Sequence, residues 1–110
     1  MFGMTQEDYQ RTYDHILRVV AYRMGLDSEL TERELQHQIM EKDPMAYRLA
    51  ELYRNAYQSW WGAGKAVDGC QDESIISGLR EALMQTIRER DEYRKSIESY
   101  LAAKYQKIGG

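Results

Sequence analysis

Residues 43–61 read DPMAYRLAELYRNAYQSWW, an amphipathic helical pattern with a wide apolar arc. Asp43 and Pro44 predict its start, because Asp can cap a helix and proline is tolerated at the first helical position. The apolar side chains cover close to half of the helical circumference: Met45, Leu49, Leu52, Tyr53, Ala56, Tyr57, Trp60 and Trp61. One neighbouring helix needs less than this. We therefore predict that this helix is central to the domain, or that part of its face is kept for another chain.

Two more helices are predicted before this stretch. Thr5 is typical of an N-cap, and Gly25 supplies a stop after an apolar stripe made of Tyr9, Tyr13, Ile16, Leu17, Val20 and Met24. Thr31 and Glu34 form a capping-box pattern at the start of a shorter helix that runs to about Lys42. Residues 1–61 are thus expected to form three helices.

A glycine-containing loop is predicted over 62–71, followed by a long C-terminal helix over 72–108. At 1.5 Å per residue this helix could reach about 50 Å, which exceeds a compact bundle of this size. We expect its first half to complete the bundle and its second half to pair with a partner helix, most simply that of a second copy. Arg90 falls on its apolar stripe, so either the helix leaves the core there or Arg90 meets an acid across an interface.

The composition fits one all-α domain over residues 1–110, a small bundle of about four helices. Apolar residues make up 43% and charged residues 30% of the 110 residues, and the net charge is −3. The predicted core comprises Tyr9, Tyr13, Ile16, Leu17, Val20, Leu35, Ile39, Leu49, Leu52 and Ala56. The single cysteine, Cys70, cannot close an intrachain disulfide, and no secretory signal or membrane-spanning run is evident, so we expect a cytoplasmic protein outside the membrane.

Candidate catalytic and binding motifs are incomplete. Glu34 and His37 have the spacing found on two helices of di-iron bundles, but one copy does not make a site. Residues 62–65, GAGK, lack the remaining positions of a phosphate-binding loop. Cys70 has no base or cation placed near it by the sequence. We expect no catalytic residue, no metal site and no cofactor, and therefore no enzyme.

The segment from Leu30 to Tyr53 resembles a helix-turn-helix unit, because LTEREL opens many such units and two capped helices follow a short turn. The sequence departs from that pattern at Gln36, Met40 and Glu41. The resemblance implies a nucleic-acid-associated regulator that uses the 30–61 helix pair, although no segment gathers Lys and Arg to hold phosphates. The acidic excess of residues 1–43 suggests another alternative, a small acidic inhibitor of a nucleic-acid-handling protein.

The aromatic residues support a different leading hypothesis. Nine tyrosines and two tryptophans accompany a single phenylalanine, and Tyr and Trp are enriched in protein interfaces. We therefore expect a non-enzymatic interaction module, a small adaptor or regulator that covers a partner protein and self-associates. The predicted interface residues are Tyr57, Trp60, Trp61, Arg90, Tyr93, Ile97, Tyr100, Leu101 and Tyr105.

Overall fold

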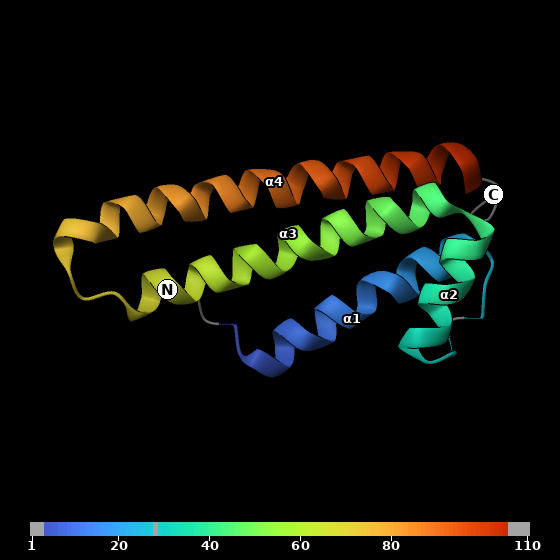
Figure 1. The fold of residues 1–110 in the computed structure, drawn as a ribbon, viewed down its shortest axis with the longest axis horizontal. Helices are drawn as coiled ribbons and strands as arrows, with labels where there is room; N and C mark the ends of the chain where they lie inside the picture. The colour runs from blue at the N-terminus through green and yellow to red at the C-terminus, as the bar shows by residue number, and fades with distance from the viewer. Residues whose placement is uncertain (1–3, 28, 106–110) are drawn as a thin grey trace.

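The computed structural model describes residues 4–27 and 29–105, and every regular element in these ranges is an α-helix. Helix α1 spans Gln6–Arg23, α2 spans Glu32–Lys42, α3 spans Pro44–Gly69 and α4 spans Glu73–Tyr105 (Figure 1). The predicted all-α class, with four helices and a long C-terminal helix, is confirmed. The predicted extension of the last helix over 106–108 lies outside the described residues.

The helix starts form as their sequences predict. The Thr5 hydroxyl accepts a hydrogen bond from the backbone N–H of Asp8 at 3.1 Å. Thr31 and Glu34 make both bonds of the capping box, which satisfies two backbone donors at the start of α2. The Asp43 carboxylate accepts from the backbone N–H of Ala46 at 3.2 Å and so caps α3.

The predicted loop over 62–71 is wrong in most of its length. Helix α3 continues to Gly69, and only residues 70–72 connect it to α4. Each glycine inside a helix costs about 1 kcal/mol relative to alanine, but this penalty is small beside the packing of a long helix against its neighbour. Gly64 is buried, so this part of α3 lies close to other atoms of the protein.

Helix α3 is the central helix, which is one of the two alternatives predicted from its wide apolar arc. It packs against α1, α2 and α4, and α4 runs beside it along nearly its whole length (Figure 1). Because the connection after Gly69 is short, the two helices are antiparallel, and the end of α4 returns to the start of α3. The main core lies at this end and contains Leu17, Val20, Ala21, Met24, Leu35, Ile39, Ala46, Ala50, Ile97 and Leu101.

The second half of α4, and not the first half as predicted, contributes buried residues to the main core. Ile97 and Leu101, in the second half, are 3% and 2% exposed and belong to the main core. No residue of α4 before Ile97 is buried. The antiparallel hairpin explains the difference, since it places the second half of α4, and not the first, beside α1 and α2. Of the predicted core, Tyr13, Leu49 and Leu52 are only partly buried.

The hairpin gives the molecule an elongated shape, 50 × 25 × 23 Å. The ends of α3 and α4 that are joined by residues 70–72 extend beyond α1 and α2 (Figure 1). We call residues 60–93 the arm. Within the described part of the chain, no helix has a segment both long enough and apolar enough to cross a lipid bilayer.

Candidate interaction surface

Aromatic rings from α1 and α3 gather at the base of the arm. The Tyr9 ring stacks on Trp61 with centroids 4.3 Å apart and on Tyr57 at 5.6 Å, and Tyr57 lies 5.1 Å from Trp60. The structure therefore brings together three predicted interface residues, Tyr57, Trp60 and Trp61. Tyr57 is only 5% exposed, whereas both indoles are partly exposed. The Trp61 Nε1 is buried and has no acceptor among the described residues.

Helix α4 is continuous through Arg90, and none of its residues before Ile97 is buried. The Arg90 guanidinium lies 4.6 Å from the centroid of the Trp60 ring and bonds to the Asp91 carboxylate at 3.1 Å. Its charge is thus met by an aromatic face and by an acid of the same chain. Arg90 connects α4 to the aromatic group, and Tyr93 is partly buried one turn further along the helix.

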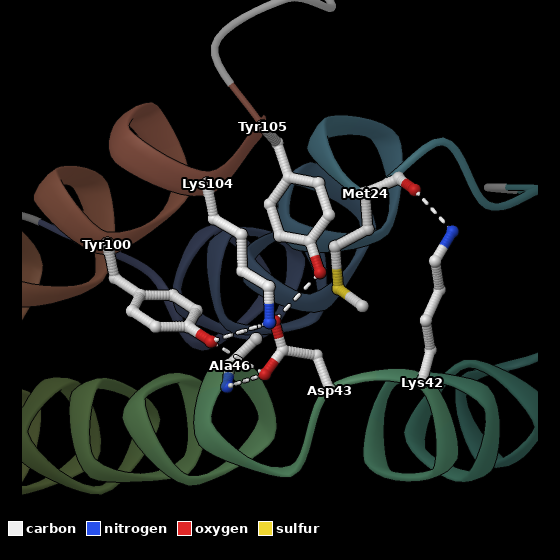
Figure 2. Close-up of polar contacts among 7 residues, drawn as sticks. All are labelled: Met24, Lys42, Asp43, Ala46, Tyr100, Lys104 and Tyr105. Carbon is white, nitrogen blue, oxygen red and sulfur yellow. Dashed lines mark hydrogen bonds and ion pairs between the residues drawn. The ribbon is translucent and has the colours of Figure 1, made fainter.

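A buried carboxylate joins the start of α3 to the end of α4 (Figure 2). Asp43 is 2% exposed, and it accepts hydrogen bonds from the Tyr100 hydroxyl at 2.8 and 2.9 Å and from the Tyr105 hydroxyl at 2.7 Å. The Lys104 ammonium is 3.0 Å from the same carboxylate. Two predicted interface residues, Tyr100 and Tyr105, thus direct their hydroxyls to a site inside their own chain.

Burial and hydrogen bonds within this cluster shift the pKa values of Asp43, Lys104 and Tyr105. Burial alone would raise the pKa of Asp43, but hydrogen bonds from Tyr105, Tyr100 and Lys104 outweigh it and lower that pKa to about 2. The hydrogen bond to Asp43 raises the pKa of Lys104, and burial followed by the bond to Asp43 raises the pKa of Tyr105 to about 12. The carboxylate therefore stays ionised at neutral pH and is sealed from substrate, so the cluster fixes structure and is unsuited to acid–base catalysis.

A second buried charge lies in the middle of α3. The side chain of Arg54 is 3% exposed, and it pairs with Glu51 at 3.2 Å and with Glu32 of α2. Its guanidinium also lies 4.1 Å above the Tyr13 ring, while its Nε has no partner among the described residues. Arg54 lies within the 30–61 helix pair, for which the helix-turn-helix resemblance implies a nucleic-acid-associated role. The structure instead uses that cation to join α1, α2 and α3.

The remaining polar residues considered for catalysis or metal binding do not come together at one site. His15 and His37 are exposed, and no three His, Cys, Asp or Glu side chains of residues 4–27 and 29–105 gather to form a possible metal site. The Lys65 ammonium lies 4.5 Å from the centroid of the Trp61 ring, on a helix rather than in a phosphate-binding loop. Cys70 contacts the backbone oxygen of Asp72 at 3.5 Å.

Sequence reasoning missed the internal roles of Asp43 and Arg54. Asp43 was recognisable as a helix cap, but its contacts with α4 depend on the antiparallel return of a helix more than fifty residues away. No local pattern distinguishes Arg54 from its exposed neighbours.

No protein-family model, no curated protein and no solved structure matches this chain. Over residues 4–27 and 29–105, the fold is all-α, with four helices and a long antiparallel hairpin.

Proposed function

We propose that this chain is a non-enzymatic protein–protein interaction module that self-associates through its arm. The observation that supports this proposal is the burial pattern: Gly64 is the single buried residue among residues 60–93, all of which are described. Apolar side chains are nevertheless frequent there. A second copy packed against the arm would cover them.

When only two helices pack together, as α3 and α4 do in the arm, each helix covers only part of the apolar stripe of the other. In the arm, Ile76, Leu79, Leu83 and Ile87 are all partly exposed, although α4 packs against α3. Burial of apolar surface stabilises by about 25 cal/mol per Å², so the open sides of the pair favour a further helix. Two hairpins packed together would form a four-helix arrangement in which these side chains reach a dry interior.

One side of α4 offers a continuous stripe for such packing. Ile75, Leu79, Ala82 and Thr86 follow one another at helical spacing, and Tyr93 extends the line by two turns. Ile75 is 54% exposed, which is unusual for a side chain of its kind. A two-fold dimer would place this stripe against its own copy, and two-fold dimers are the commonest protein oligomers.

The proposed surface includes part of the predicted interface. Trp60, Trp61, Arg90 and Tyr93 lie at the base of the arm and keep partly exposed side chains. The other predicted residues occupy positions within this chain. Tyr57, Ile97 and Leu101 are buried, and the Tyr100 and Tyr105 hydroxyls bond to Asp43.

Light scattering at micromolar concentrations tests this proposal. We expect the wild-type protein to show twice the 13.0 kDa mass of the chain. The double variant Ile75→Glu, Ala82→Glu should be a monomer, because it places charge at the centre of the proposed contact. Both side chains are exposed in the single chain, so the monomer should retain its helices in circular dichroism.

Met45→Glu is the matched control. Met45 is 51% exposed, close to the exposure of Ile75, but it lies at the start of α3, far from the arm. This variant should remain a dimer. A monomeric wild-type protein, or equal dissociation of the Met45 variant, would refute self-association through the arm.

A further inference from the structure

A groove of about 370 Å³ lies between α1 and α4, at the end of the molecule opposite the tip of the arm. Helices α1 and α4 both pack on α3 but meet each other at few points, so the space between them stays open. The lining is largely apolar and includes Ile16, Val20, Tyr53, Ile97 and Leu101. Burial raises the pKa of the Tyr53 phenol, as expected for a dry floor.

The two walls of the groove carry positive charge. Arg23 stands on the α1 wall and Arg94 on the α4 wall, and neither guanidinium makes an ion pair with a described residue. Glu98 is the one acid in the lining. The groove is thus locally positive in a chain whose net charge is −3. An occupant with acidic groups on both flanks would be attracted to it.

The apolar surface continues beyond the groove, which favours an elongated occupant over a small molecule. Val19 borders both the groove and a neighbouring hollow that Tyr22 also lines, and these side chains are 40% and 65% exposed. On the α4 wall, Ala102 is exposed, whereas Ile97 and Leu101 are buried side chains of the main core.

We infer that the α1–α4 groove binds an amphipathic helix of another protein, with its apolar face on the groove floor and its acidic flanks beside Arg23 and Arg94. This is the helix-in-groove mode of recognition, in which apolar anchors supply affinity and flanking charges select the partner. The groove is separate from the proposed dimer surface on the arm, so the two proposals stand independently.

Fluorescence anisotropy with two short labelled peptides tests this inference. Both peptides carry leucines at helical a and d positions; one has glutamate at the other positions and its sister has lysine there. We expect the glutamate peptide to bind at least about tenfold more tightly than the lysine peptide at low salt, and added salt to reduce the difference. The double variant Arg23→Glu, Arg94→Glu should abolish this preference.

Three further variants separate groove binding from other causes. Arg80→Glu, Arg88→Glu makes the same change in net charge on exposed arm residues and should bind like wild type. Ile75→Glu, Ala82→Glu should also bind, whatever its oligomeric state. Ala102→Gln puts a neutral polar side chain into the groove and should weaken binding. Equal binding of both peptides, an equal loss in the Arg80 and Arg88 variant, or unchanged binding in the Ala102 variant would overturn the inference.

Discussion

Asp43 joins three helices through one carboxylate and its backbone. It follows the last residue of α2, caps α3 through the Ala46 N–H, and accepts the hydroxyls of Tyr100 and Tyr105 from α4. Each of these hydrogen bonds offsets part of the free-energy cost of burying the negative charge of Asp43. Loss of that charge should therefore weaken the packing of α4 on the bundle.

The free energy of unfolding should fall in acid because of Asp43. Its pKa is about 2 in the folded protein against an ordinary value of 3.8, so the ionised form is favoured by folding. The resulting stabilisation is present above pH 3.8 and is lost as the pH falls toward 2. Its size should be roughly 2 kcal/mol, measured by urea unfolding across this range.

Asp43→Asn should lower stability at neutral pH and flatten this acid transition, because asparagine can still cap a helix but cannot titrate. Asp8→Asn, which changes an exposed acid of α1, serves as the control and should keep the transition. An unaltered acid profile in the Asp43 variant would show that other carboxylates cause the loss.

At the scale of helices, the glycines of α3 show that packing can outweigh the low helix propensity of individual residues. Gly62 lies inside the helix and is exposed, and a Cβ atom placed there would meet nothing within 4 Å. Glycine has greater backbone freedom in the unfolded chain than alanine, so its presence weakens the helix. The predicted loop over 62–71 rested on this preference alone.

Gly62→Ala should therefore stabilise the protein by about 0.5–1 kcal/mol, because the helix already continues through this position. Chemical unfolding measures the change. If the segment were a loop, the gain would be absent.

Gly25→Ala provides the opposite comparison. Gly25 follows α1 with a φ of 78°, a left-handed conformation that costs alanine about 1 kcal/mol or more. Space is available at both glycines, so the backbone conformation alone should make the effects opposite in sign.

At the scale of the whole molecule, stability should differ along the long axis. The bundle end contains the main core, including Leu17, Leu35 and Ile39, whose side chains are fully buried. The arm holds a single buried residue, Gly64. Regions with few buried apolar contacts open locally at lower free energy than the core.

Hydrogen exchange should reveal this gradient and locate the dimer contact. In the monomeric Ile75→Glu, Ala82→Glu variant, arm amides should exchange at least about tenfold faster than amides beside Leu17 and Leu35. Dimerisation of the wild type should slow the exchange of the arm selectively. Identical arm exchange in the two proteins would place any contact between copies elsewhere.

Local sequence patterns are sufficient to predict the helical class and the helix starts. Thr5, Thr31 and Asp43 each accept a hydrogen bond from a backbone N–H three residues away, so local spacing predicts these bonds. The sequence also predicted the central position of α3 as one of two alternatives, because the width of an apolar arc reports how many neighbours a helix needs.

Long-range packing determines which half of α4 enters the core, how far α3 continues, and which polar side chains are internal. The predicted interface list contained Ile97 and Leu101, which lie in the core, beside Trp60 and Trp61, which stay partly exposed. Periodicity identifies an apolar face but not the surface it meets. That surface depends on the antiparallel turn after Gly69, which brings the end of α4 to Asp43 through contacts between residues far apart in the chain.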